Sequence, residues 1–89
     1  MKLSKEKRLN ISEQILAILF SNTPYSVFTS FIARETARDE EFIKKLLFDM
    51  KEKNLVTEIK KNPDGKDYIK RVRWKLSDAA YNAYKKNQQ

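Results

Sequence analysis

Apolar residues in the first quarter of the chain recur at the spacing of an α-helix. They share the i, i+4, i+7, i+8 pattern of one helical face: Ile11, Ile15, Ile18 and Leu19. This helix is expected to end before Pro24, because proline has no backbone N–H and biases its predecessor toward extended geometry. A shorter helix is predicted over residues 29–37, with Thr29 or Ser30 as its N-cap.

A third helix is predicted to begin at Asp39, whose side chain is a favourable N-cap. Glu40 and Glu41 follow in the first turn, where the helix dipole favours negative charge. The apolar stripe of this helix consists of Ile43, Leu46, Leu47 and Met50. Asn54 fits the left-handed residue that ends such a helix.

After Asn54 the pattern changes to alternation, which predicts strands over residues 55–60 and 68–76. The Asn-Pro-Asp-Gly sequence at 62–65 favours a tight turn between them, so the two strands form a β-hairpin. In the second strand one face is apolar and suits the core: Val72, Trp74 and Leu76. The opposite face is basic: Arg71, Arg73 and Lys75.

Ser77 is a favourable N-cap for a last helix that runs through Tyr84. Residues 1–89 are predicted to form one α+β domain, because a chain of 89 residues cannot bury two separate cores. Residues 1–8 and 86–89 are expected to be flexible.

The charge balance of the chain favours an acidic partner. Nineteen Lys and Arg residues against twelve Asp and Glu residues give a net charge of +7, which attracts polyanions such as nucleic acid. The chain has no Cys, no His and a single Gly. This composition argues against thiol or imidazole catalysis and against glycine-rich phosphate loops. We therefore expect no enzyme activity, cofactor, metal site or small-molecule ligand.

Membrane and export segments are not expected. The longest apolar run, Ile15 to Phe20, has six residues, whereas a bilayer-spanning helix needs about 20. The basic N-terminus is not followed by an uninterrupted apolar region with a small-residue cleavage site, so no signal peptide is predicted. An intracellular, cytoplasmic location is the expectation.

The segment from the second helix into the hairpin carries a specific pattern. Ile32-Ala33 is followed without a gap by Asp39, Ile43, Met50 and Asn54-Leu55-Val56. With the order helix, helix, helix, hairpin, helix, the chain resembles MarR-like or small archaeal and viral winged-helix transcription regulators. The family usually has Gly where Ala37 and Asn54 stand, and Ala37 suggests a continuous or tighter turn.

The resemblance implies a winged helix-turn-helix of three helices, a two-stranded β-wing and a C-terminal helix. It implies sequence-specific binding of double-stranded DNA, with the third helix in the major groove and the wing on the backbone or minor groove. It also implies a homodimer closed by the first and last helices, where Leu3, Phe20, Tyr81 and Tyr84 are available.

The candidate DNA contacts are eight basic residues of the third helix, its preceding turn and the hairpin: Arg38, Lys44, Lys45, Lys60, Lys61, Lys66, Arg71 and Arg73. Two structural explanations remain open. The hairpin cations could protect a strand edge from aggregation. The helix lysines could instead form i, i+4 ion pairs, Glu40 with Lys44 and Glu41 with Lys45.

The sequence is also compatible with two other functions. The acidic start of the third helix and Phe48, which lies opposite the apolar stripe, are features of a winged-helix protein-interaction module without strong DNA binding. An RNA-binding winged helix is a third possibility.

Overall fold

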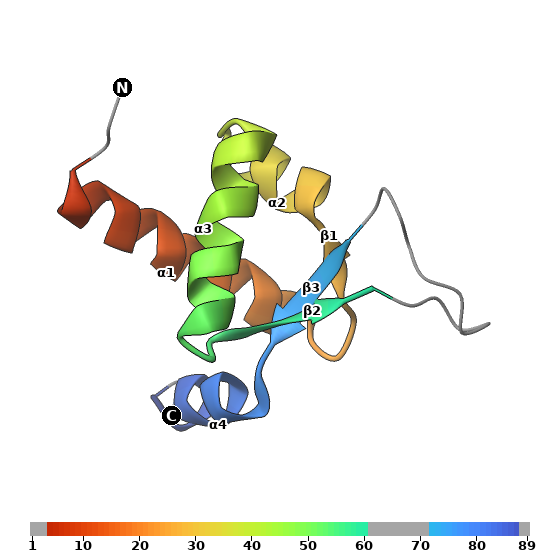
Figure 1. The fold of residues 1–89 in the computed structure, drawn as a ribbon. Helices are drawn as coiled ribbons and strands as arrows, with labels where there is room; N and C mark the ends of the chain where they lie inside the picture. The colour runs from red at the N-terminus through yellow and green to blue at the C-terminus, as the bar shows by residue number, and fades with distance from the viewer. Residues whose placement is uncertain (1–3, 61–71, 88–89) are drawn as a thin grey trace.

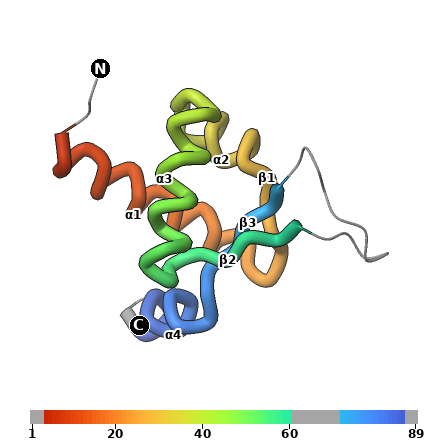
Figure 2. The backbone as a smooth tube through the Cα atoms, viewed as in Figure 1, coloured from red at the N-terminus to blue at the C-terminus, as the bar shows by residue number. Residues whose placement is uncertain are grey.

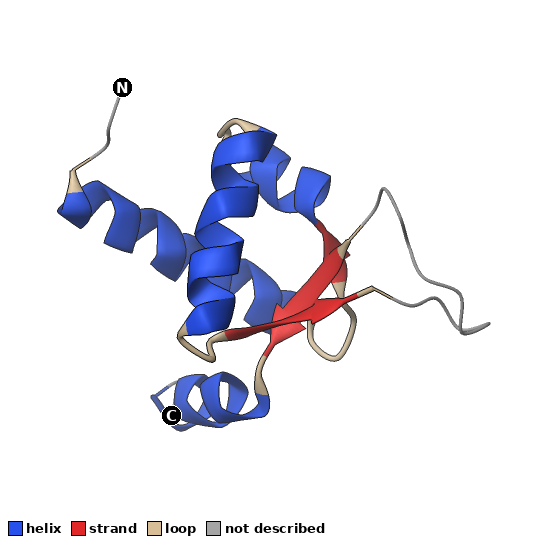
Figure 3. Ribbon diagram, viewed as in Figure 1, coloured by secondary structure: helices blue, strands red, loops and turns tan. Residues whose placement is uncertain are grey.

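The structure is a computed structural model that describes residues 4–60 and 72–87. Within these residues the element order is α1 (Lys5–Asn22), β1 (Val27–Phe28), α2 (Thr29–Thr36), α3 (Glu40–Glu52), β2 (Val56–Ile59), β3 (Arg73–Leu76) and α4 (Asp78–Asn87). Figures 1 and 3 show α1, α2 and α3 together on one side of the strands, with α4 below them. The predicted α+β winged-helix fold is confirmed.

The first helix begins well before its apolar stripe. Ser4 caps α1 by accepting a hydrogen bond from the backbone N–H of Lys7. The helix therefore includes residues 5–8, although every side chain from Lys5 to Asn10 is exposed. No helix in the described residues combines the length and the apolar character needed to cross a bilayer.

The two ends of α2 correct two expectations. Neither Thr29 nor Ser30 caps α2, which has Phe28 at the N-cap position and no capping side chain. Ala37 makes the turn neither continuous nor tighter, because it adopts the left-handed conformation with φ 55°. Asp39 then caps α3 as predicted, and its carboxylate accepts from the backbone N–H of Phe42 at 3.2 Å.

The left-handed Ala37 gives a stability prediction. An L-residue in this conformation costs about 1–2 kcal/mol, whereas glycine adopts it freely but loses more chain entropy on folding. Ala37→Gly should therefore raise the free energy of unfolding by about 0.5–1 kcal/mol in urea titrations. Ala17→Gly inside α1 is the matched control and should lower it by about 1 kcal/mol. A loss of stability in both variants would contradict the left-handed turn.

The sheet has one more strand than the predicted hairpin. Its order is β1-β3-β2 with antiparallel pairs, and it confirms β2 and β3 as the two strands of the wing. The unpredicted strand β1 pairs Val27 with Trp74 and Phe28 with Arg73. The predicted turn at 62–65 lies outside the described residues.

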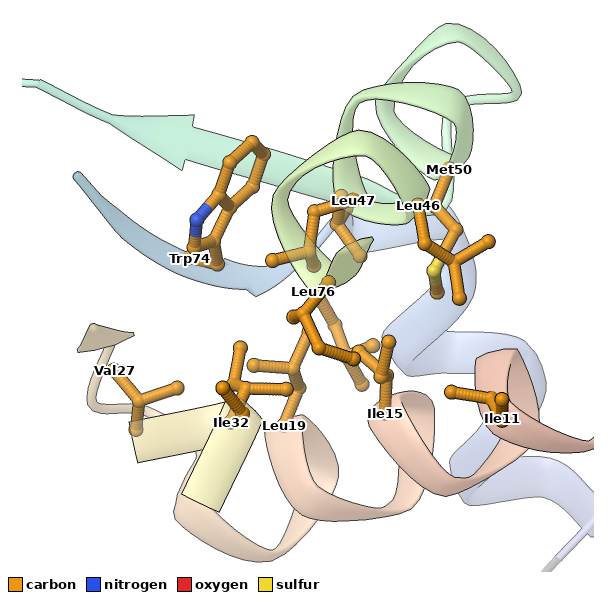
Figure 4. Packing of buried hydrophobic residues seen from close by; sticks show 13 residues of the cluster. Ile11, Ile15, Leu19, Val27, Ile32, Leu46, Leu47, Met50, Trp74 and Leu76 are labelled. Atoms are coloured by element: carbon orange, nitrogen blue, oxygen red, sulfur yellow. The ribbon is translucent and has the colours of Figure 1, made fainter. Parts of the chain in front are cut away.

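The core lies between α1, α2, α3 and the sheet. Figure 4 shows Ile15 and Leu19 of α1 facing Leu47 of α3, with Trp74 of β3 beside Leu47. Trp74 is completely buried, so its predicted place in the core is confirmed. The core residues of α3 are those of the predicted stripe: Ile43, Leu46, Leu47 and Met50.

The start of the last helix is hydrogen-bonded to the residues that follow α3. The Ser77 hydroxyl accepts from the backbone N–H of Ala80 at 3.0 Å and donates to the carbonyl of Asn54 at 2.8 Å. Asn54 is left-handed with φ 59°, as predicted. Tyr81 and Tyr84 pack on Phe20 of α1, with ring centroids 5.6 and 4.7 Å apart. These aromatic rings, expected at a dimer interface, thus already contact one another within one chain.

Candidate nucleic-acid interface

The side of α3 opposite its buried stripe is exposed. Figures 1 and 2 show α3 in front of α1 and α2, with β2 and β3 to one side of it. Helical geometry places four residues along the middle of this outer side: Glu41, Lys45, Phe48 and Glu52. We call these four residues the crest of α3.

The candidate cations on and before α3 are exposed. Lys44 and Lys45 point away from the core, and Arg38 lies exposed in the turn before the helix. Within the described residues, no ion pair joins Glu40 to Lys44 or Glu41 to Lys45. The i, i+4 pairs considered from the sequence are therefore not formed in this structure, and the two lysines remain accessible to another partner.

A groove of about 370 Å³ separates the first half of α3 from the wing. Phe48 and Trp74 form its aromatic part, and their rings meet edge to face with centroids 5.5 Å apart. Among the described residues, the charged side chains of its lining are three carboxylates and one amine: Asp39, Glu40, Glu41 and Lys44. The described lining of this groove is therefore acidic, although the chain as a whole is strongly basic.

Glu58 of the wing holds two cations that come from different elements. Its carboxylate lies 2.8 Å from the amine of Lys51 on α3 and 3.6 Å from the amine of Lys60. The Glu58 side chain is 4% exposed, whereas those of Lys51 and Lys60 are 44% and 62% exposed. The contact with Lys51 joins the wing to the C-terminal half of α3, whereas the contact with Lys60 lies within the wing, and both amines stay reachable from solvent.

The two faces of the wing carry different cations. Trp74 faces α3, so the alternation of β3 places Arg73 and Lys75 on the opposite face. Arg73 is half-buried there, in register with Phe28 and Ile59. The structure therefore brings Lys60 to the α3 side of the wing and places Arg73 on the other side. Three candidates lie outside the described residues: Lys61, Lys66 and Arg71.

Sequence reasoning missed Lys51 and Glu58 as site residues. The sequence did contain a signal for Glu58. It lies two residues after the buried Val56 and so shares the inner face of β2. A carboxylate at such a position needs a cationic partner. The identity of that partner depends on how α3 packs on the sheet.

Searches against protein-family models and against curated proteins give no match for this sequence. Solved structures do match. The MepR–DNA complex from S. aureus aligns with TM-score 0.76 and 16% identity over 93% of this chain and 68% of that one. ZitR, a zinc-responsive MarR family member from Lactococcus lactis, aligns with TM-score 0.68 and 22% identity over 99% of this chain. The fold is that of a MarR-like winged helix.

The MarR-like winged helix of this chain is shorter than its structural neighbours. It spans 53% of the ZitR chain and 59% of a mutant MepR from a multidrug resistant S. aureus isolate, which aligns with TM-score 0.71. At identities of 16–22% the likeness establishes the fold. The function depends on the residues that this chain itself presents.

Proposed function

We propose that this protein binds double-stranded DNA sequence-specifically as a transcription regulator. In this proposal α3 enters the major groove, and the wing lies on the adjacent backbone or minor groove. The observation that carries it is the exposed crest of α3 beside the described strands of the wing, in a hairpin whose sequence is strongly basic. The likeness in fold to MepR, whose structure was determined in complex with DNA, supports the same function.

The distribution of charge suggests different roles in DNA binding for the hairpin and for α3. Residues 60–75 carry seven basic and two acidic side chains, so the hairpin supplies the attraction to phosphates. Residues 39–53 carry five acidic and four basic side chains, so α3 supplies almost no net attraction. The wing therefore provides most of the affinity, and the helix is left to discriminate among base pairs.

A homodimer closed by α1 and α4 is part of the proposal. The exposed start of α1, including Leu9 at 55% exposure, supports it, because an uncovered helix end is stabilised by packing against another surface. Two copies would place their recognition helices about 34 Å apart and require a palindromic site. Sedimentation of the protein with and without duplex measures the stoichiometry directly.

A salt-dependent binding titration tests DNA binding by the wing. Each Lys or Arg that binds a phosphate contributes about 0.9 to the slope of log affinity against log salt. Replacing both Arg71 and Arg73 with Ala should therefore flatten the slope by about 0.9 for each arginine that binds a phosphate. Lys86→Ala, at the far end of α4, is the control and should leave the slope unchanged. Unchanged affinity in the double variant would contradict the assignment of the wing.

The acidic groove favours one alternative function, a protein-interaction module. Its three carboxylates and the rings of Phe48 and Trp74 suit a basic protein segment. Recovery of a stoichiometric protein partner, together with duplex binding no tighter than about 10⁻⁴ M, would favour this function over gene regulation.

A further inference from the structure

We propose that Glu41, Lys45 and Phe48 are the base-reading residues of α3, and that Glu41 selects a C·G base pair. This inference rests on the proposed DNA binding and adds the sequence specificity of the same surface. The three side chains differ in chemistry: one only accepts hydrogen bonds, one only donates them, and one is apolar. Each therefore fits a different edge in the major groove.

The placement of the three residues follows from the packing of α3. Ile43, Leu47 and Met50 are buried against the core, so the crest projects on the opposite side of the helix. From Glu41 to Phe48 the helix rises by about 10 Å. Successive base pairs rise by about 3.4 Å. The row therefore spans about three base-pair steps, which is the reach of one recognition helix.

Glu41 is available for this role because other groups already meet the structural needs of the helix start. Asp39 provides the N-cap through Phe42, and Glu40 also lies in the first turn. No ion pair in the described part of the chain involves Glu41. Its carboxylate gives no attraction to phosphates, so its contribution in the major groove is discrimination.

A carboxylate discriminates among base edges because it cannot donate a hydrogen bond. It accepts hydrogen bonds only, and the major-groove donors are the amino groups of cytosine and adenine. At adenine the neighbouring N7 is a second acceptor and repels the carboxylate, whereas cytosine presents no acceptor beside its amino group. Glu41 therefore favours cytosine. Guanine and thymine present acceptors to the Glu41 carboxylate. A base pair that places guanine or thymine at this position, such as G·C instead of C·G, is therefore rejected.

The other two crest residues complete the reading. The Lys45 amine, one helical turn after Glu41, donates to O6 and N7 of guanine. Phe48 offers an apolar edge to a thymine methyl group. This residue is 38% exposed, and its ring packs edge to face on the buried Trp74. Because the ring is held by the core, it meets the DNA in a fixed position.

Selection from a random 20-base-pair duplex library tests the inference. The wild-type protein should enrich sequences with a C·G pair at one fixed position. Glu41→Gln should reduce the preference for that pair about tenfold. It should also bind random duplex more tightly, because one negative charge is removed. Glu13→Gln is the matched control, since it removes the same charge from an exposed position on α1.

The outcomes separate the inference from the function on which it rests. If the wild-type protein enriches sites and Glu41→Gln keeps the same base preference, the inference is wrong while DNA binding stands. Equal loss of preference in Glu13→Gln would also contradict it, because the effect would then come from net charge. If the wild-type protein enriches no duplex at all, the proposed function fails and the inference fails with it.

Discussion

Replacing Trp74 with Ala should lower the free energy of unfolding by about 3–5 kcal/mol, the cost of removing a large buried side chain. Trp74 is completely buried and lies between β1 and β2, in register with Val27 and Glu58. Its indole N–H donates a 2.8 Å hydrogen bond to the buried hydroxyl of Thr29. A small domain has about 5–15 kcal/mol of stability in total, so the alanine variant should be close to unfolding at room temperature.

Two gentler variants measure the hydrogen bond between Trp74 and Thr29. Thr29→Val keeps the shape of the side chain but leaves the buried indole N–H without its acceptor, which costs about 1–3 kcal/mol. Thr29→Ser keeps the hydroxyl and should cost less. In the double variant Trp74→Phe with Thr29→Val, both partners are gone, so the destabilisation should be smaller than the sum of the two single effects. Chemical denaturation of the wild-type protein and these variants gives all the values.

The results for the Trp74 and Thr29 variants test the candidate nucleic-acid interface as well as the core. Trp74 is the residue against which Phe48 packs, so its replacement removes the support of one crest side chain. Additive effects of Thr29→Val and Trp74→Phe would contradict the buried hydrogen bond. Wild-type stability in Trp74→Ala would contradict the packing of the wing on α3.

The helices are predictable where burial imposes a period on the sequence. The stripes of α1 and α3 follow from the sequence because each turn of these helices places apolar residues on the core. The segment Lys5–Asn10 has no such period, because all its side chains are exposed. Its helical start depends on Ser4, a local capping residue that lies outside any apolar pattern.

Contacts between residues that lie far apart in the sequence could not be predicted from local patterns. Strand β1 has two residues, too few to show alternation, and it exists because β3 offers it an edge. Threonine is a common N-cap, but the hydroxyl of Thr29 is used by a tryptophan 45 residues away. The exposure of Lys44 and Lys45 could be predicted, because it follows from the helical period. The contact of Lys51 with Glu58 could not, because it depends on how the sheet packs on α3.

Neutralising Glu58 should increase DNA affinity. In the structure one nearly buried carboxylate holds the amines of Lys51 and Lys60, so part of their charge is already balanced within the chain. Glu58→Gln keeps the size of the side chain and frees both amines for phosphates. We expect duplex affinity to rise about tenfold at about 0.1 M salt and the salt slope to steepen by about 0.9, as for one further phosphate bound.

The cost to stability should be small and should depend on which partner is removed. Glu58→Gln exchanges charged contacts for neutral ones, and because the lysines are partly exposed the destabilisation should be about 1 kcal/mol. Lys51→Ala should cost more, because it leaves the buried carboxylate with only the 3.6 Å contact to Lys60. Thermal unfolding of the two variants ranks them.

Asp49→Asn is the matched control for the affinity change. Asp49 also lies on α3 and pairs with Arg8 at 3.4 Å, but both side chains are about half exposed. Removing its charge changes the net charge by the same amount and frees one arginine on α1, away from the wing. If affinity rises equally in both variants, net charge alone explains it. A larger rise in Glu58→Gln shows that the wing side of α3 meets the DNA, because only there do the released amines reach phosphates.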